Sequence, residues 1–474
     1  MVTEKFRYQL RQEAQLWRSQ NLIDSELYEH LATRYQFAEL DTAAKNRFVM
    51  VLIGLGSVLL GLAVITFVAA NWQVWGREVK VLLLMSLFVL VNGAGFYLWR
   101  SRRDRWQTRL GQGLLLLGSL ILGANMALMS QMFHQSGSLY QLYLVWGLAV
   151  LVMAASLQLT LLGMVAVILT GIGYWLGVPD LFRAGQITIY ELALHHLPLL
   201  ASLLFIPLAY WCRSRWIFGL AAVLVTGSLE MNLIWQMNEF SGATFMQGII
   251  AAIATATPAA LLWAYRDSFW LFHPTESPNF DSISRGLAVF FLGLLFYVFS
   301  FHFFWNGSPN FLVLQGEITW LDLLTLVDAF ILTGLAIFAW VRLGHENHSR
   351  FGWQIDLSST VIAAMILVSS ALIYYQVTSG ELGAIATFIF NVFFFLIAAG
   401  SIREALTEAQ RKGFWFGIVL LVLQIFTRMF EYNTELVFKA IVLFLCGIGI
   451  IVAGLWFERY LRNLPPSATV TNES

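Results

Sequence analysis

Hydrophobic residues in this chain come in long blocks that polar positions rarely interrupt. Each block is about 20 residues long, enough for a helix rising about 1.5 Å per residue to cross a hydrocarbon core about 30 Å thick. A helix on a soluble protein would carry a polar stripe at helical period, and most of these blocks carry none. The pattern predicts an all-α, polytopic bundle of about 14 membrane spans, at residues 48–70, 79–99, 110–132, 140–156, 160–178, 196–212, 216–236, 246–265, 286–304, 320–341, 356–375, 382–400, 413–430 and 436–457.

Three of these spans have weak boundaries. Only the segment 156–160 separates the fourth span from the fifth, and it contains the polar residue Gln158. The sixth span is short and contains both Pro198 and Pro207, which interrupt helical hydrogen bonding.

The first 45 residues are polar and charged, so they predict no cleavable signal peptide. Their apolar residues recur at helical spacing in two groups, namely Phe6, Leu10 and Trp17, and then Leu27, Leu31 and Tyr35. Asp24 stands where it can cap the second helix. The pattern predicts a small cytoplasmic helical hairpin over residues 1–38. Such a hairpin serves either as a docking or self-association module or as a belt resting on lipid head groups.

Composition agrees with a membrane protein. Hydrophobic residues make up 58% of the chain and charged residues 12%, whereas soluble domains carry about 25% charged residues. The formal net charge is zero, which predicts no nucleic-acid partner. Two cysteines, Cys212 and Cys446, give no sign of a disulfide framework.

Lys and Arg residues sort strongly between the two sides of the predicted bundle. Of the 28 in the chain, 23 fall in the N-terminal segment, the even-numbered loops and the tail. The other side receives five: Arg77, Lys80, Arg183, Arg428 and Lys439. Positive residues stay on the cytoplasmic side, so both termini are predicted to be cytoplasmic. The expected location is a bacterial cytoplasmic (inner) membrane, with an internal membrane as the alternative.

The expected organisation has four parts: a hairpin and linker at 1–46, a first membrane unit at 47–178, a second at 179–457 and a polar tail at 458–474. Gly56–Gly61 and Gly118–Gly123 share a small-residue spacing at an offset of 62 residues. This likeness fits a duplicated helix pair, as in many transporters. It also fits glycine faces that arise because they let helices approach closely in lipid.

Polar residues within and beside the spans gather on the predicted extracytoplasmic side. One group lies in the stretch 130–138, a predicted outer turn in which Gln131 and His134 share a helical face if the third span continues that far. Asp328 lies about 12 Å along its span. We expect these residues to line a pocket open to the outer leaflet, made by Asn71, Trp72, Gln131, His134, Glu230, Asn232, His302, Asp328, Arg428 and Glu431.

Arg428 is the cation placed to neutralise Asp328 or Glu230, or to pair locally with Glu431 three residues on. An unpaired carboxylate at such depth would bind a proton, which raises the possibility of proton coupling. The alternative interpretation is structural: the whole cluster forms interhelical hydrogen bonds that hold the bundle together.

No signature of catalysis, cofactor or metal emerges. The chain has no nucleophile elbow, Walker loop or dinucleotide fingerprint, and we predict no cofactor. Histidines 134, 195, 196 and 302 lack the spacing of zinc ligands, and neighbouring His195 and His196 would point in different directions on a helix. A non-enzymatic role is favoured. A membrane transferase would need its acid from Glu191, Glu230 or Asp328.

Several stretches resemble a bacterial membrane family known as domain of unknown function 2157. The first is Trp17 with Asn21–Ile23, and the second is Ala69–Trp72. The third comprises Gly123–Ala124, Gln131–His134 and Ser136–Gly137, so the likeness covers about residues 5–175, with weaker similarity at Arg428–Phe430, Gly447 and Glu458–Arg459. This resemblance implies a multi-pass bacterial membrane protein and no particular activity.

The leading hypothesis is transport or handling of a lipid or small solute, with membrane lipids as partners. The first alternative is a non-catalytic membrane assembly or envelope-stress factor, acting through a protein partner or self-association at residues 1–38. A membrane transferase is the third.

Overall fold

The structure is a computed structural model of the whole chain. It describes residues 4–20, 22–35, 74–101, 104–134, 137–181, 188–240, 243–267, 279–305, 320–346, 356–380, 382–407, 411–431 and 435–463, together with the isolated positions 37, 59, 66 and 70. Contacts divide the chain into one unit over Met1–Val89 and a second over Leu90–Ser474. The division expected from the sequence at residue 178 falls inside the second unit.

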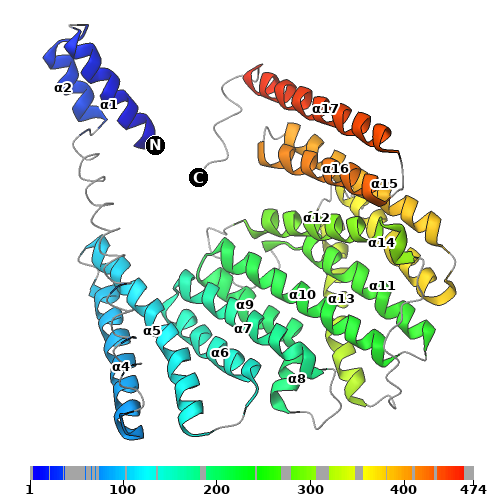
Figure 1. The fold of residues 1–474 in the computed structure, drawn as a ribbon, viewed down its shortest axis with the longest axis horizontal. Coiled ribbons are helices and arrows are strands. Elements are labelled where there is room, and N and C mark those ends of the chain that lie inside the picture. Colours follow the sequence, from blue (N-terminus) through cyan, green and yellow to red (C-terminus); the bar gives the residue numbers. More distant parts are fainter. Residues whose placement is uncertain are drawn as a thin grey trace. The chain divides into compact units, whose positions relative to one another are not determined.

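The first unit contains the predicted helical hairpin, which is confirmed (Figure 1). Helix α1 spans Glu4–Ser19 and α2 spans Ser25–Arg34. Asp24 caps α2 as expected, because its Oδ1 accepts a hydrogen bond of 2.8 Å from the Leu27 N–H. Ala14 and Phe37 form a small core covered by Trp17, Leu31 and other apolar side chains.

The remaining helices are long and apolar. Their bounds are α4 Arg77–Ser101, α5 Arg105–Met132, α6 Leu139–Leu157, α7 Thr160–Leu181, α8 Ile189–His195, α9 Leu197–Trp211, α10 Arg215–Glu239, α11 Thr244–Trp263, α12 Phe280–Phe299, α13 Trp320–Glu346, α14 Leu357–Ser379, α15 Gly383–Thr407, α16 Arg411–Glu431 and α17 Leu436–Asn463. A single turn of 3₁₀-helix, η2, covers His302–Trp305.

Twelve of these helices are long and apolar enough to cross a membrane, and α8 with α9 form a bent pair that is either one broken span or a re-entrant loop. Each predicted span from 79–99 onward therefore has its helix, whereas span 48–70 lies outside the described residues except for three isolated positions. The weakly separated fourth and fifth spans are two helices, α6 and α7, joined through Gln158 in the left-handed conformation. The all-α, multi-pass fold is confirmed.

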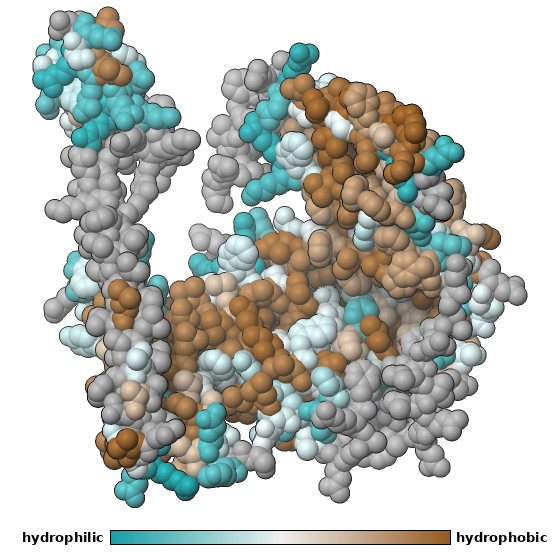
Figure 2. All heavy atoms as spheres, in the orientation of Figure 1, coloured by the Kyte–Doolittle hydropathy of each residue, from teal (hydrophilic) through white to brown (hydrophobic). Residues whose placement is uncertain are grey.

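Helices α10 and α11 lie at the centre of the second unit. Helix α10 packs against α7, α9, α11, α12 and α13, while α11 packs against α12, α13 and α14 as well. More than half of the most apolar stretch of α7, α10 and α11 is buried. Figure 2 shows hydrophobic side chains spread over the outward faces of the surrounding helices, as expected of surfaces that meet lipid.

The glycines of the 118–123 stretch allow close packing, whatever their evolutionary origin. A Cβ added at Gly118 would stand 2.3 Å from Oδ1 of Asn92 on α4. One added at Gly123 would stand 2.3 Å from the indole of Trp146 on α6, whose Nε1 donates a 2.7 Å hydrogen bond to the Ser119 carbonyl. Close helix approach thus explains these glycines, whereas Gly56–Gly61 lies outside the described residues.

We expect Gly123→Ala to lower the free energy of unfolding by about 1–3 kcal/mol, because the added methyl group displaces a hydrogen-bonded indole. Gly113→Ala on the same helix is the matched control, since nothing lies within 4 Å of its Cβ position. The control should be neutral or stabilise by up to about 1 kcal/mol through helix propensity. Thermal unfolding in detergent measures both, and equal stability of the two variants would contradict the packing argument.

Candidate functional site

A sharp break between α8 and α9 is the most unusual feature of the bundle. Thr188 and Glu191 form a reciprocal capping box that starts α8, and the helix ends seven residues later at His195. Pro198 occupies the second position of α9, where its missing N–H costs no helical hydrogen bond. The two helices bend by 76° around His196. The predicted span 196–212 is therefore only the second arm of a discontinuous helix.

His196 and Asp328 join the break to α13. Nδ1 of His196 lies 2.7 Å from Oδ1 of Asp328, and the same carboxylate accepts a hydrogen bond from the Leu199 N–H. The Asp328 side chain is 2% exposed and that of His196 24%. Asp328 thus supplies, from a distant helix, the acceptor that the first turn of α9 needs for its free N–H groups.

Helices α7 and α10 hold the other side of the break. Nδ2 of Asn232 donates a 2.7 Å hydrogen bond to the carbonyl of His195, and the hydroxyl of Tyr174 donates one of 2.8 Å to Oδ1 of Asn232. The His195 ring lies 4.9 Å from the ring of Trp235, measured between centroids. As expected, the two adjacent histidines point to different neighbours.

Four side chains on α10 and α13 have buried polar atoms that lack hydrogen-bond partners among the described residues. These atoms are Oε1 of Glu230, Nε1 of Trp235, both side-chain amide atoms of Gln236 and Oδ2 of Asp328. Gln236 and Asn232 lie four residues apart on α10 and share a helical face. Unsatisfied buried polar atoms are rare, and they often mark sites where a proton, water or ligand is bound.

A second polar cluster surrounds Arg428 near the end of α16. Its guanidinium pairs with Glu431, donates a 2.7 Å hydrogen bond from Nη1 to the carbonyl of Ser300, and lies 4.1 Å from the centroid of the Phe301 ring. Oε1 of Glu431 in turn accepts a 2.5 Å hydrogen bond from the backbone N–H of His302. The pair ties α16 to the turn that follows α12.

A cavity of about 390 Å³ opens beside this cluster, which we name the Arg428 cavity. Its wall combines polar side chains with apolar ones: His302, Ala384, Thr387, Phe388, Asn391 and Arg428. Asn391 is held in place by a 3.0 Å hydrogen bond to the Ser300 carbonyl. The sequence-predicted residues His302 and Arg428 therefore do line a cavity, with Glu431 behind them.

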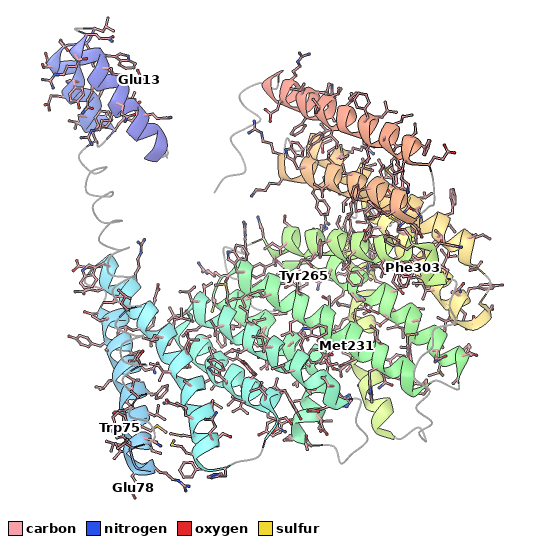
Figure 3. All side chains as sticks on the ribbon, in the orientation of Figure 1. Glu13, Trp75, Glu78, Met231, Tyr265 and Phe303 are labelled. Atoms are coloured by element: carbon pink, nitrogen blue, oxygen red, sulfur yellow. The ribbon has the colours of Figure 1, made fainter. Side chains whose placement is uncertain are left out.

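A third cluster lies where α9 and α11 end and α12 begins, away from the Arg428 cavity. Tyr265 and Phe303 lie toward opposite ends of α12 (Figure 3). Oδ1 of Asp267 accepts a 2.5 Å hydrogen bond from the hydroxyl of Tyr210, and its Oδ2 accepts one of 3.0 Å from the Phe280 N–H. Burial raises the pKa of Asp267 above its usual range, although the hydrogen bond from Tyr210 acts in the opposite direction.

The structure thus distributes the ten predicted pocket residues over several places. Asn232 and Asp328 lie at the helix break, with Glu230 on the same helix as Asn232, while His302, Arg428 and Glu431 form the second cluster. Gln131 and His134 are exposed; α5 ends at Met132, and His134 adopts a left-handed conformation beyond it. Asn71 and Trp72 lie outside the described residues.

The sequence left two alternatives for Asp328, namely a pairing with Arg428 or no partner at all. It did not identify His196 as the partner. Arg428 pairs with Glu431, the local alternative, and Asp328 with a histidine 132 positions away. Pro198 is the feature of the sequence that could have indicated this role of His196. Proline is common in the first turn of a helix, so it marks a helix start and therefore a break just before it. Within the described residues, no three His, Cys, Asp or Glu side chains gather as a metal site.

Comparison with known proteins agrees with the membrane assignment. Residues 15–163 match the model of the family described as predicted membrane protein (DUF2157), which confirms the resemblance seen at Trp17 and at Gln131–His134. The weaker similarity at Arg428–Phe430 lies outside that match. No curated protein and no solved structure matches the chain. Over residues 15–163 this membrane protein is therefore similar to the family of predicted membrane proteins described as DUF2157.

Proposed function

We propose that the protein transports or handles a membrane lipid in a bacterial cytoplasmic membrane, with its phosphate-bearing head group in the Arg428 cavity. The observation that carries this proposal is the mixed lining of that cavity. It places a guanidinium, an imidazole and an amide beside the apolar side chains Ala384 and Phe388. An arginine is well suited to bind a phosphate, while the apolar rim suits the start of an acyl chain.

The predicted orientation supports this use of the cavity. His302 and Glu431 follow or end spans on the side that receives five of the 28 Lys and Arg residues, so the cavity would open toward the outer leaflet. The discontinuous helix α8–α9 supports a transport role, because broken helices beside buried polar residues are a recurring feature of transporter binding sites.

Native mass spectrometry of the protein in nanodiscs of mixed anionic and neutral phospholipids tests the proposal. We expect the wild-type protein to retain anionic lipid selectively. Ala384→Trp, which fills the cavity without touching the Arg428–Glu431 pair, should reduce that retention about tenfold, as loss of one charge-assisted hydrogen bond would do.

Ile385→Trp is the matched control, because Ile385 is the next residue of α15, is exposed and does not line the cavity. It should retain lipid as the wild type does. Equal retention by both tryptophan variants would refute a lipid site in this cavity. Selective stabilisation by free inorganic phosphate, lost in Ala384→Trp alone, would instead point to a soluble anion.

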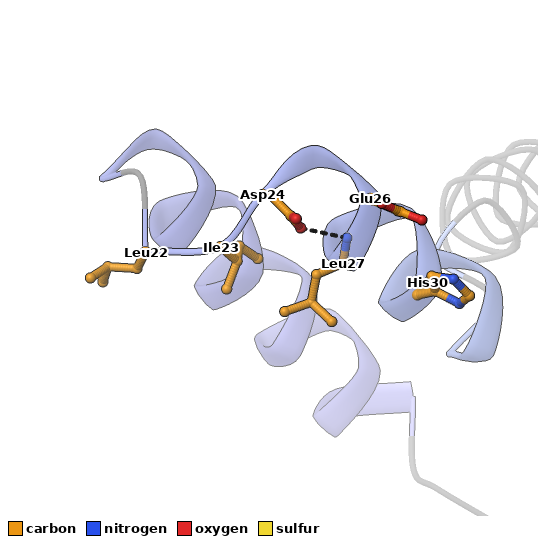
Figure 4. Close-up of a pocket in the computed structure, with 6 residues that line it drawn as sticks. All are labelled: Leu22, Ile23, Asp24, Glu26, Leu27 and His30. Carbon is orange, nitrogen blue, oxygen red and sulfur yellow. Dashed lines mark hydrogen bonds between the residues drawn. The ribbon is translucent and has the colours of Figure 1, made fainter.

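A second candidate function rests on the N-terminal hairpin, namely membrane assembly through a protein partner or self-association. Leu22, at 68% exposed, and Leu27 line a shallow groove with Ile23, Asp24, Glu26 and His30 (Figure 4). A groove that combines exposed leucines with acidic side chains suits an amphipathic helix from a partner. This alternative predicts that deletion of residues 1–38 abolishes the cellular phenotype, whereas Ala384→Trp leaves it unchanged; lipid handling predicts the reverse.

A further inference from the structure

The helix break contains a buried carboxylate with an incomplete set of partners. Oδ1 of Asp328 faces His196 at 2.7 Å, whereas Oδ2 is buried and has no partner among the described residues. A carboxylate in a bundle core is costly unless a counter-ion and hydrogen bonds satisfy both oxygens. His196 is the counter-ion at hand, and it balances the charge only while it holds a proton.

The two members of the pair differ in their exposure. His196 is 24% exposed and Asp328 2% exposed, so the imidazole stands between the surface of the bundle and the buried acid. An imidazole can accept a proton at one ring nitrogen and release one from the other, which suits it to this position.

We propose that the His196–Asp328 pair is a proton-binding site within the bundle. The step is a single protonation. Without this proton the pair carries one negative charge, on Asp328. Addition of one proton makes the pair neutral, and the only covalent bond that forms is an N–H or O–H bond. The site is independent of what occupies the Arg428 cavity.

Protonation of the pair also bears on the shape of the helix. The same carboxylate accepts the Leu199 N–H in the first turn of α9, and His196 is the residue about which α8 and α9 bend by 76°. A proton on His196 draws the negative charge of the Asp328 carboxylate toward the imidazolium, and so changes the strength of the hydrogen bond that the carboxylate accepts at the start of α9. Proton binding and the geometry of the break are linked through one side chain.

Several other titratable or charged groups lie on the packed elements. The acids and histidines are Asp180 on α7, Glu191 and His195 on α8, Glu230 and Glu239 on α10, and Asp322, His345 and Glu346 on α13; the side chains of Glu239, Asp322 and Glu346 are not described. The cations are Arg215 on α10 and Arg342 on α13. Glu191 is used in the cap of α8 and His195 lies against Trp235. The sequence of α11 contains no titratable residue. Glu230 is thus the group to follow separately.

Dicyclohexylcarbodiimide tests the proposal, because this lipophilic reagent modifies carboxyl groups in their protonated form. The full-length protein in nanodiscs is treated across a pH series, and labelling is quantified by mass spectrometry of the separate peptides containing Asp328 and Glu230. In the wild type, labelling of Asp328 should appear only toward acid pH, because the imidazolium keeps the carboxylate ionised. In His196→Gln it should persist to a pH about 1–3 units higher, since the opposite charge is gone.

His345→Gln, on the same helix as Asp328 and 17 positions further along the chain, removes an imidazole that contacts the Val341 carbonyl and should keep the wild-type profile. Absence of Asp328 labelling at every pH in both the wild type and His196→Gln would overturn the proposal. So would identical profiles in these two proteins. Protection of Asp328 by sodium but not by choline would assign the site to a metal cation instead.

Discussion

Asp328→Ala should lower the free energy of unfolding by about 3–5 kcal/mol, the cost of breaking a buried ion pair by removing one member. The change leaves His196 without its partner and the Leu199 N–H without its acceptor. Because that N–H belongs to the first turn of α9, the loss falls on the helix break itself. Tryptophan-detected thermal unfolding in detergent measures the effect.

Val327→Ala provides the matched control for this variant. Val327 precedes Asp328 on α13 and is 42% exposed on the outside of the bundle, so its truncation removes little buried surface. We expect its effect to remain below about 1 kcal/mol. Equal destabilisation by the two alanine variants would mean that this part of α13 is sensitive to any truncation, and that the ion pair has no special role.

The second large effect on stability is expected at the buried ion pair of α16, and the exposed ion pair of the same helix is its control. Arg428 and Glu431 are 15% and 13% exposed, whereas Arg411 and Glu458 are 65% and 46% exposed. Arg428→Gln should cost about 3–5 kcal/mol, because it leaves Glu431 buried and unpaired and removes the hydrogen bond to Ser300. Arg411→Gln should cost less than about 1 kcal/mol, because water and salt already screen that pair.

Salt dependence separates these two cases further. Raising the ionic strength shortens the Debye length from about 10 Å at 0.1 M to about 3 Å at 1 M, which weakens exposed pairs and hardly affects buried ones. The difference between Arg428→Gln and the wild type should therefore persist at high salt. A difference that vanishes at 1 M salt would show that the Arg428 pair is effectively exposed.

The Arg428 cavity and the helix break divide between them most of what the sequence suggested as one pocket. The cavity has volume, a cation and an apolar rim, and these suit a lipid head group. The break has a short contact between His196 and Asp328 and a bend, and these suit proton coupling. Since each has its own test, a lipid site without a proton site, or the reverse, can be recognised.

Local chemistry determined what the sequence by itself could establish. A run of about 20 apolar residues has a favourable transfer free energy into lipid whatever its neighbours are, so twelve helices and the bent pair match predicted spans. Asp24 caps α2 because capping joins residues two or three apart, and Glu431 lies within a single helical turn of Arg428.

Tertiary structure alone decided the partners that lie far apart in the chain. Asp328 meets His196 across 132 positions, and Arg428 meets Ser300 across 128. Hydropathy predicts that each helix enters the membrane. It does not predict which helices become neighbours or which face of each helix makes the contact. Within the bilayer that choice rests on close packing and on hydrogen bonds between helices, and neither follows any period along the chain.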